Sequence, residues 1–410
     1  MKVINQYKGL RKELYILFIG RMMTALGQMI QPMLTLILSQ KLGLNAATIA
    51  LVFLVYTFVS IPLNILGGKL ADRLNKRNII IVCDLISVSS YIYCFFMDIS
   101  ITSMVIFGIA SLFQSIEGPA YDALIADFSK SKDRDRAYSL GYLGMNLGLV
   151  LAPTLGGILF KNYLNLAFLI NGLLILFSTI LIFALIKDVH KEEDEDLSYE
   201  KELDDKTSAL KIISGNRVLL LYLIMAVFES GFYNMYNYLM PLDLGIMFEE
   251  TGSIIYGTMS SLNCIEVALL TAFITNIVAK RSDMGKSVIG QIFEITGILI
   301  FVLGMKNIYM DYIAIFIFTL GEILCTIASS PFLTRRIPAS HRGRIISTVY
   351  VSSQVGSALL ENATGKIHDV KGMMVAWCFV LILGFVALIL KGTIRVIDKK
   401  DYSKLYKGTN

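Results

Sequence analysis

The sequence predicts an all-α membrane protein with twelve transmembrane helices, and three observations lead to this prediction. Hydrophobic residues make up 55% of the chain and charged residues only 17%, which lies outside the range of soluble globular domains. Apolar runs of about 20 residues, the length that crosses a hydrocarbon core of roughly 30 Å, recur along the whole chain. These runs are too long for β-barrel strands, and a helix satisfies its own backbone hydrogen bonds in lipid.

In chain order, six helices precede a long polar stretch and six follow it. The first apolar run is too long for a cleavable signal and lacks a small-residue cleavage site, so it is expected to remain as helix one. The first six helices are expected at 14–40, 46–68, 78–98, 101–127, 137–160 and 165–186. The second six are expected at 217–243, 252–279, 286–306, 309–333, 344–366 and 373–392.

Lysine and arginine fall almost entirely on one side of the predicted membrane. The side that carries both termini and the loops after even-numbered helices holds 31 of the 37, including six in the C-terminal segment 391–407. The other side keeps only Lys41, Lys161, Lys306, Lys366 and Lys371. Basic residues favour the cytoplasm, so both termini are predicted to be cytoplasmic in a multi-pass protein of the cell membrane. The net charge of +5 reflects this bias rather than nucleic-acid binding.

The polar stretch that begins at Asp188 divides the chain into two similar halves. It carries ten acidic residues in DVHKEEDEDLSYEKELDDKTSAL, which is typical of a solvated linker. Motif residues recur at a constant offset of 208 on either side of it, for example Arg134-x-Arg136 and Arg342-x-Arg344. The predicted domains are an N-terminal six-helix half (1–187), an acidic linker (188–215) and a C-terminal six-helix half (216–410). Six helices per half make the repeats parallel.

Two motifs resemble signatures of the major facilitator superfamily. GKLADRLNKR, from Gly68 to Arg77, resembles the loop motif G-x-L-A-D-R-x-G-R-K between helices two and three, with Asn in the place of the second Gly. GLVLAPTLGG, from Gly148 to Gly157, is similar to the helix-five motif G-x-x-x-G-P-x-x-G-G of the antiporter branch, with Ala152 in place of a Gly. The resemblance implies two parallel six-helix repeats that work by alternating access.

Two further segments resemble drug exporters within this superfamily. ALIADFSKSKDRDRAYSLGYLGMNLG is similar to their passage from helix four to helix five, and FTLGEIL, from Phe318 to Leu324, resembles the acidic helix-ten segment of LmrP-like multidrug exporters. The arginine that the family carries in helix four is replaced by Ser111. The resemblance therefore implies multidrug efflux without a proton relay through that arginine.

The charged loop after helix two is interpreted as a latch. Gly68 and the glycine before it permit close backbone approach. The resemblance implies that Asp72 docks on the N-terminus of helix eleven, across the two halves, where the helix dipole favours an anion. Arg73 or Arg77 is then expected to pair with Asp127 and hold the cytoplasmic side closed in an outward-open state. The alternative is an ordinary positive-inside loop.

Small residues in helix five predict a tight and bendable helix contact. Gly148, Ala152 and Gly156 are spaced by four and share one face, along which another helix can approach closely. Pro153 removes a backbone donor and favours a kink, and Gly157 ends the motif. These residues are expected to form a pivot, although small faces also occur in any packed membrane bundle.

Acidic residues within the predicted helices are the main candidates for function. An ionised carboxylate at mid-bilayer costs several kcal/mol unless it is paired, hydrated or neutral. Helices one, four, seven and ten line the cavity in the family that the motifs resemble, so we rank Glu322, Glu229 and Glu117 first. Helix nine lies outside in that family, so Glu294 ranks lower. The other candidates are Asp122, Glu266 and Glu361.

Three more residues complete the predicted cavity. Arg21 lies 208 residues before Glu229 and is expected to face the same cavity as a counter-ion, with a structural salt bridge as the alternative. Tyr233 and Asn237 in helix seven suit flat amphipathic ligands, through stacking, cation–π contact and hydrogen bonding, although core packing explains most aromatic residues equally well.

These features predict a proton-coupled antiporter that exports amphipathic, cationic small molecules and functions as a monomer in the lipid bilayer. No cofactor or metal is expected, and the proton gradient is the expected energy source, since phosphate-binding and zinc motifs are absent from the sequence. The alternatives are a proton-coupled transporter of a specific sugar, peptide or siderophore, and an intramembrane enzyme with a Glu322–Glu229 dyad.

Overall fold

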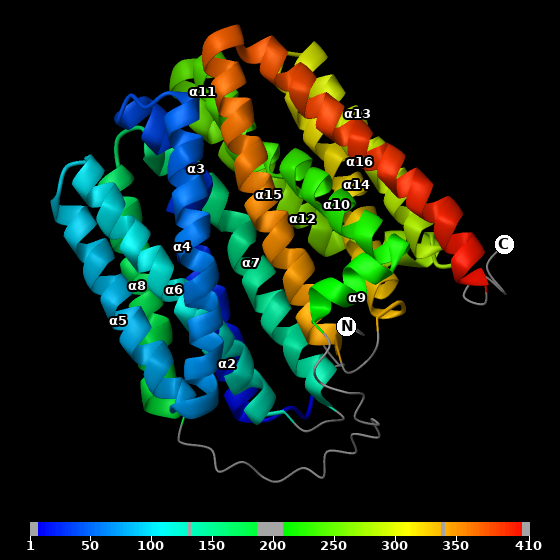
Figure 1. Cartoon of the computed structure of the whole chain (residues 1–410). Coiled ribbons are helices and arrows are strands. Elements are labelled where there is room, and N and C mark those ends of the chain that lie inside the picture. Colours follow the sequence, from blue (N-terminus) through cyan, green and yellow to red (C-terminus); the bar gives the residue numbers. More distant parts are fainter. Residues whose placement is uncertain (1–6, 130–132, 187–207, 338–340, 404–410) are drawn as a thin grey trace. The chain divides into compact units, whose positions relative to one another are not determined.

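The computed structural model describes residues 7–129, 133–186, 208–337 and 341–403, and its described segments are mainly helical (Figure 1). Each of the twelve helices expected from the sequence is present. Ten stretches of the described chain are long and apolar enough to cross a membrane, and the stretch Arg217–Ile277 contains three consecutive helices. The remaining long helix, Arg342–Lys371, is more polar.

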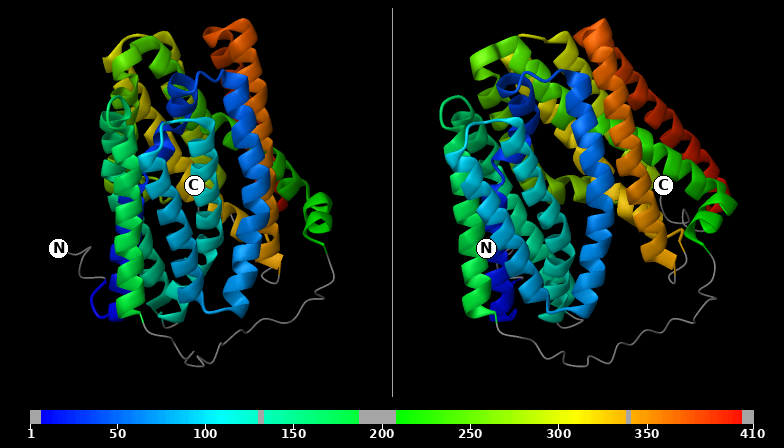
Figure 2. Two further views of the ribbon diagram at one scale, coloured as in Figure 1. Left: turned by 90° about the vertical axis from the view of Figure 1, so that its left-hand side faces the viewer. Right: turned by 60° about the vertical axis from the view of Figure 1, so that its left-hand side comes forward.

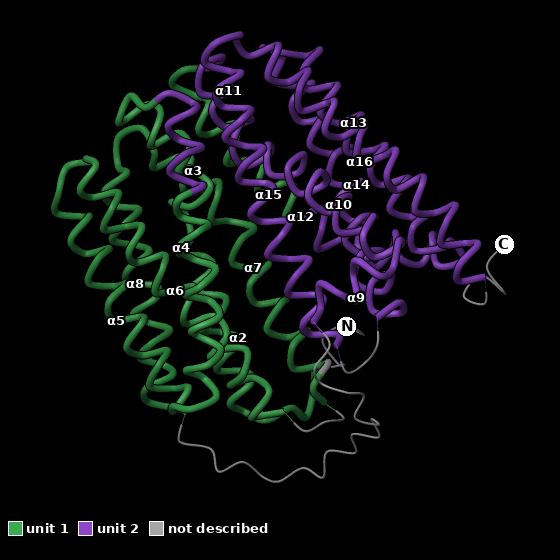
Figure 3. Tube along the Cα trace, in the orientation of Figure 1, with its two compact units in different colours: residues 1–44, 55–197, 249–264 green, residues 45–54, 198–248, 265–410 purple. Residues whose placement is uncertain are grey.

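The helices group into two compact units, which are coloured separately in Figure 3. Unit 1 comprises residues 1–44, 55–197 and 249–264, and unit 2 comprises residues 45–54, 198–248 and 265–410. Two helices, α4 (Ala46–Arg73) and α12 (Gly252–Ile277), therefore contribute residues to both units. Most of the predicted acidic linker lies outside the described residues, and its last part forms a short helix, α9 (Ala209–Gly215).

Unit 1 contains the other helices of the N-terminal half. Its first span is built from α2 (Lys12–Gly27), α3 (Ile30–Leu36) and the π-helical segment η1 (Ile37–Lys41). The next helices are α5 (Lys76–Phe96), α6 (Ile101–Asp127), α7 (Arg134–Phe160) and α8 (Leu164–Leu185). Helix α2 packs on α7 and α8, and α5 packs on α6 and α8, as the views in Figure 2 also show. A short 3₁₀ turn, η3 (Glu249–Thr251), precedes α12.

Unit 2 contains the C-terminal helices that surround the candidate site. The seventh span is divided at Asn234 into α10 (Arg217–Tyr233) and α11 (Met235–Phe248). The others are α13 (Asp283–Leu303), α14 (Ile308–Thr334), α15 (Arg342–Lys371) and α16 (Met373–Asp401). Helix α13 packs on α14 and α16, and α10 packs on α15 and α16.

Each unit contains a cluster of buried apolar side chains. In unit 1 one cluster joins Leu14 and Leu17 of α2 to Tyr121 and Leu124 of α6. In unit 2 a second cluster joins Val218 of α10 to Phe332 of α14 and Ile394 of α16. Many large apolar side chains of the described helices stay exposed, as expected for surfaces that face lipid.

The last helix differs most from its expected length. The sequence places its end at residue 392, where basic residues become frequent, but α16 continues for nine more residues to Asp401. Ile394 is fully buried along this extension because the apolar face of α16 continues past the basic residues. Residues that were assigned to a polar tail therefore lie on a packed helix.

Candidate functional site: an acidic cavity in unit 2

A cavity of about 510 Å³ lies among helices α10, α13, α14 and α15 of unit 2. Three carboxylic acids contribute to its wall, namely Glu229 from α10, Glu294 from α13 and Glu322 from α14. The remaining wall combines hydroxyl groups, the rings of Tyr222, Tyr233 and Tyr350, and aliphatic side chains. A cavity that pairs acidic groups with aromatic rings suits a cation with an apolar body.

Glu322 is positioned by an aromatic neighbour, Tyr233, for which the sequence analysis expected only contact with a ligand. The Tyr233 hydroxyl donates a hydrogen bond to Oε1 of Glu322 over 2.9 Å. The Tyr233 ring stacks on Phe318, with ring centroids 5.7 Å apart. Phe318 and Glu322 are four residues apart and so share a face of α14, which presents both to α10.

Glu229 forms an ion pair with Lys391 of α16, a residue that the sequence analysis counted only as part of the basic C-terminal segment 391–407. The Lys391 ammonium lies 2.5 Å from Oε1 of Glu229 and 3.3 Å from the Cys325 sulfur, and Lys391 is fully buried. Lys391 lies at the end of the predicted helix 373–392, and the sequence analysis did not expect it to be buried inside a packed helix that continues to Asp401. The continued apolar spacing of residues 390–397 is the signal that indicates a longer helix.

The low rank of Glu294 is contradicted by its position in the cavity wall. Glu294 is 2% exposed, and its Oε2 atom has no hydrogen-bond partner among the described residues. It lies on α13 between Gly290 and Gly297, where the backbone of α14 approaches so closely that a Cβ would meet it. The pattern Gly290, Glu294, Gly297 follows one helical face, and this spacing could have identified the acid as facing α14.

Unit 1 holds a second group of acidic residues that does not belong to this cavity. Glu117 is buried in α6, and its carboxyl group lies within hydrogen-bonding reach of Asp84 from α5. The Thr179 hydroxyl donates to Oδ2 of Asp84 over 2.6 Å. The sequence analysis did not select Asp84, although an acid within a predicted helix is itself a signal for function.

Arg21 has a partner within its own unit. Its Nη1 atom lies 3.1 Å from Oδ1 of Asp122, and its guanidinium lies over the Tyr121 ring at 4.7 Å from the centroid. Asp122 is thus brought together with Arg21 rather than with the cavity of unit 2. This geometry agrees with the salt bridge that the sequence left open as an alternative.

Three other predicted residues of the second half do not contribute to the cavity wall. Glu266 of α12 is 5% exposed, and both of its carboxylate oxygens are without a hydrogen-bond partner among the described residues. Asn237 lies on α11 and is exposed. Glu361 of α15 is buried and accepts a hydrogen bond from Ser357 over 2.8 Å.

The loop after α4 pairs differently from the prediction. Asp127 binds the Lys76 ammonium at 2.7 Å, so the expected pairing with Arg73 or Arg77 is wrong. Arg77 instead donates to the carbonyl oxygen of Phe183 over 2.6 Å, because Lys76 begins α5 and directs Arg77 toward α8. Asp72 is exposed at the end of α4, and its predicted docking stays a prediction.

The glycines of this loop have unequal roles. A Cβ on Gly67 would meet the backbone of Ile116 in α6, so this glycine permits a close contact between α4 and α6. A Cβ on Gly68 would meet nothing within 4 Å, so Gly68 does not mediate the close approach that was expected of it.

The small-residue face of α7 is a close helix contact. A Cβ on Gly148 would meet the backbone of Met22 and Leu26 in α2, and a Cβ on Gly156 would meet the carbonyl oxygen of Met29. Ala152, between them, is fully buried. The first span is thus the neighbour for which the spacing of four is required, with α2 against Gly148 and the start of α3 against Gly156.

The end of the same motif faces α12. A Cβ on Gly157 would meet the backbone of Ser253 and Ile254, and the carbonyl group of Pro153 lies against Gly257. The Ser253 hydroxyl donates to the carbonyl oxygen of Gly157 over 3.1 Å. Pro153 lies inside an otherwise continuous α7. Whether these residues act as a pivot stays a prediction.

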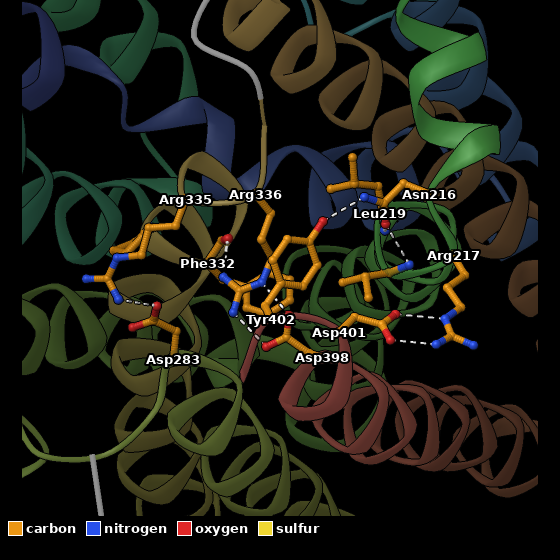
Figure 4. Close-up of polar contacts among 12 residues, drawn as sticks. Asn216, Arg217, Leu219, Asp283, Phe332, Arg335, Arg336, Asp398, Asp401 and Tyr402 are labelled. Carbon is orange, nitrogen blue, oxygen red and sulfur yellow. Dashed lines mark hydrogen bonds and ion pairs between the residues drawn. The ribbon is translucent and has the colours of Figure 1, made fainter. Parts of the chain in front are cut away.

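A network of polar contacts links the ends of several helices of unit 2 (Figure 4). Arg336 donates to both carboxylate oxygens of Asp398, at 2.5 and 2.6 Å, and its guanidinium lies 3.7 Å from the centroid of the Phe332 ring. Asn216 caps the first turn of α10 and donates to the Tyr402 hydroxyl. This network lies apart from the cavity and joins α10, α14 and α16.

Acidic groups outnumber basic ones at the unit 2 cavity. Three carboxylic acids contribute to its wall, and in the described part of the chain Lys391 supplies the ammonium group that pairs with one of them, Glu229. Among the described residues no group of His, Cys, Asp and Glu has the arrangement of a metal site. The acids can hold protons or a cationic ligand, whereas a hydrolytic centre would also need an activated nucleophile.

Comparisons with known proteins agree with this architecture. A family model described as the Major Facilitator Superfamily matches residues 17–360. A Na⁺, Li⁺, K⁺/H⁺ antiporter of Planococcus maritimus is 23% identical over 389 residues, which cover 88% of this chain and 89% of the antiporter. The quinolone resistance protein NorA of Staphylococcus aureus (strain MSSA476) is 28% identical over 265 residues, covering 61% of this chain and 65% of NorA.

Solved structures show the same fold at low sequence identity. A POT family transporter in complex with 5-aminolevulinic acid has a TM-score of 0.77 and 14% identity, covering 96% of this chain and 97% of that chain. The nucleoside transporter NupG has a TM-score of 0.71 and 14% identity, covering 95% and 100%. Similarity at this level of identity shows the fold alone.

Proposed function

The chain belongs to the Major Facilitator Superfamily, and from this premise we propose that it is a proton-coupled antiporter that exports amphipathic, cationic small molecules by alternating access. The observation that carries the proposal is the acidic and aromatic cavity of unit 2, where Glu229, Glu294 and Glu322 lie beside Tyr233 and Tyr222. Carboxylates attract a cation and can exchange it for protons. Aromatic rings stabilise a delocalised cation and an apolar body.

The relatives support the same proposal. NorA is described as a quinolone resistance protein, and the Planococcus protein exchanges alkali cations for protons by its description. We assign the coupled proton to Glu322 in the first place, because its repeat partner 208 residues earlier is the neutral Gln114. An acid that the shared helical scaffold required would be expected at both repeat positions. An acid that only one half carries therefore favours a functional role.

The proposal also covers the setting of the protein. We infer that the chain works as a monomer in the cell membrane with both termini in the cytoplasm, as the Lys and Arg bias favours. The proton gradient supplies the energy, and no cofactor takes part. One proton that moves with the electrical field contributes about 2.3 kcal/mol per 100 mV.

Dye transport in inverted membrane vesicles tests the proposal. Vesicles that contain the protein are energised with an imposed proton gradient, and uptake of ethidium or tetraphenylphosphonium into the lumen is recorded. We expect accumulation that stops when the gradient is collapsed with a protonophore. Empty vesicles from the same strain are the control. Uptake that is insensitive to collapse of the gradient would refute proton coupling.

A second candidate function is exchange of alkali cations for protons. The same three carboxylic acids favour it, since hard oxygen ligands suit Na⁺, Li⁺ and K⁺, and the Planococcus relative carries that description. Addition of each chloride salt to acid-loaded vesicles, with a pH-sensitive dye inside, distinguishes the two functions. Alkalinisation by NaCl, LiCl or KCl together with an absence of dye uptake would favour this second function.

A further inference from the structure

Lys391 occupies an unusual place behind the acidic cavity of unit 2. It comes from α16, is fully buried, and its ammonium group lies 2.5 Å from Oε1 of Glu229 and 3.3 Å from the sulfur of Cys325. The pair leaves Glu229 21% exposed, and Glu229 belongs to the cavity wall. A ligand in the cavity can therefore reach the same carboxylate that Lys391 neutralises from behind.

Glu294 provides a second position for the same ammonium group. Its side chain is 98% buried, its Oε2 atom has no hydrogen-bond partner among the described residues, and it also lines the cavity. The Cys325 thiol lies beside both Glu294 and Lys391. An ionised carboxylate buried without a partner costs several kcal/mol, so the acid form of Glu294 is stable while Lys391 binds Glu229.

We propose that Lys391 is a tethered cation that moves from Glu229 to Glu294 when a cationic substrate binds Glu229, and that Glu294 releases its proton in that step. The inference rests on the proposed export of cationic substrates. Before binding, Glu294 is neutral and the Glu229 carboxylate pairs with the Lys391 ammonium. After binding, Glu229 pairs with the substrate, Glu294 is ionised and pairs with Lys391, and one proton has left the cavity. The net charge is unchanged.

The surroundings of Lys391 permit this exchange. The charged or titratable groups around it in the described part of unit 2 are Glu229 and Tyr222 on α10, Glu294 on α13 and Cys325 on α14. Glu322 is held separately by the Tyr233 hydroxyl. The four-carbon side chain of lysine lets the ammonium group move between neighbouring carboxylates without movement of the helix. The exchange therefore adds one released proton to any that Glu322 provides.

Calorimetry on the purified full-length protein tests the inference, with tetraphenylphosphonium as the probe. Titrations in two buffers of different ionisation enthalpy give both the dissociation constant and the number of protons released. We expect Glu294→Gln to release one proton fewer than the wild type and to bind about tenfold more weakly, since the displaced Lys391 then finds no carboxylate. Because Glu294 is neutral before binding, its amide variant is expected to fold.

The double variant Glu294→Gln/Lys391→Met separates the tethered cation from a merely structural lysine. Without Lys391, Glu229 is protonated before binding and releases that proton to the buffer when the probe binds, so both the affinity and the proton count should return toward wild-type values. Equal proton release by Glu294→Gln and the wild type would overturn the inference, and so would a double variant that binds as weakly as Glu294→Gln.

Failure of the proposed function gives a different result. A wild-type protein that does not bind tetraphenylphosphonium would overturn the export of cations and this inference together. Normal binding with a proton count that falls in Glu322→Gln, but not in Glu294→Gln, would retain the proposed function and reject only the exchange by Lys391.

Discussion

Buried charges in unit 2 are of two kinds, and their surroundings decide what each can do. Glu229, Glu294 and Glu322 line a cavity, so a ligand or a proton can replace their present partners. Arg336 and Asp398 have almost no exposed surface and satisfy each other with two hydrogen bonds. The first kind is suited to exchange, whereas the second is suited to holding helices together.

The first residue-scale prediction concerns Glu322→Gln. The amide oxygen can still accept the Tyr233 hydrogen bond, so we expect normal expression and thermal stability. Accumulation of a cationic dye in energised vesicles should fall, by up to about fiftyfold per 100 mV if one coupled charge is lost. Downhill exchange of a neutral substrate should persist. Full gradient-driven accumulation by a well-expressed variant would reject Glu322 as the coupling acid, and Glu229 and Glu117 would become the leading candidates.

The second residue-scale prediction concerns the buried ion pair. Asp398→Asn leaves the Arg336 guanidinium buried without its carboxylate, which costs about 3–5 kcal/mol in comparable buried pairs. We expect a clearly lower melting temperature by circular dichroism in detergent. Asp401→Asn is the matched control, because it breaks the solvent-exposed pair with Arg217 three residues farther along α16 and should change little. Similar melting of both variants would contradict the structural role of the buried pair.

At the scale of elements, close helix contacts depend on the absence of side chains. The backbone of α2 lies against Gly148 of α7, and the backbone of Met29, which precedes α3, lies against Gly156, so the first span packs on α7 more closely than larger residues would allow. This contact lies within unit 1 and was expected from the spacing of four. Its partner helix was not, because the spacing identifies a face but not the neighbour on that face.

We predict that Gly148→Leu and Gly156→Leu each reduce the transport rate at least about tenfold, because overpacking a close contact costs about 1–3 kcal/mol and separates α2 from α7. Dye binding should be affected less, since the cavity of unit 2 is unchanged. Gly108→Leu in α6 is the control, because a Cβ there meets nothing within 4 Å. Normal transport by both α7 variants would remove the argument for a pivot.

Asp369 at the end of α15 stabilises the first turn of α4 within unit 2. Its carboxylate oxygens accept hydrogen bonds from the backbone amides of Ala46 at 3.0 Å and Ala47 at 2.8 Å. The neighbouring His368 binds Asp243, which also accepts a hydrogen bond from Trp377 over 2.6 Å. A carboxylate at a helix N-terminus accepts hydrogen bonds from otherwise unpaired amides and interacts favourably with the positive end of the helix dipole.

We therefore predict that Asp369→Ala increases hydrogen–deuterium exchange in the peptide that contains residues 46–54, while the rest of α4 keeps its protection. A lost cap of this kind costs about 1 kcal/mol, which corresponds to roughly fivefold faster exchange for local opening. Lys371→Ala, two residues away on the same turn, is the control. Unchanged exchange in Asp369→Ala would show that the first turn is held by other contacts.

At the scale of the whole molecule, the predicted latch at Asp72 concerns the balance between outward-open and inward-open conformers. We expect Asp72→Asn to insert and fold but to shift the population toward inward-open conformers, because the variant lacks the carboxylate that is predicted to dock on helix eleven. The shift is measured in inverted vesicles, whose outer face is the cytoplasmic one. Single cysteines that only the inward-open state exposes to this face should react faster with a membrane-impermeant reagent in the variant. Asp98→Asn, an exposed acid in the loop between α5 and α6, is the control. Equal labelling of Asp72→Asn and wild type would reject the latch.

The sequence by itself determined the all-α membrane fold, the twelve helices and the family, because long apolar runs and glycine-rich motifs are local features. It also identified Glu229, Glu322 and Tyr233, since an acid or a polar aromatic in an apolar run stands out without knowledge of its neighbours. The small-residue face of α7 was predictable for the same reason, because a spacing of four residues is visible in the sequence itself.

Only the tertiary structure decided which charges meet. The sequence counted Lys391 with the basic segment at the end of the last predicted helix. Packing of α16 buries it against Glu229, and this helix continues to Asp401 because a helix end depends on burial as well as on composition. Asp127 has Lys76 as its partner, and Glu294 lines the cavity despite the expected position of its helix. Partners far apart in sequence depend on how helices rotate and cross, and this is set by the packing of the whole unit.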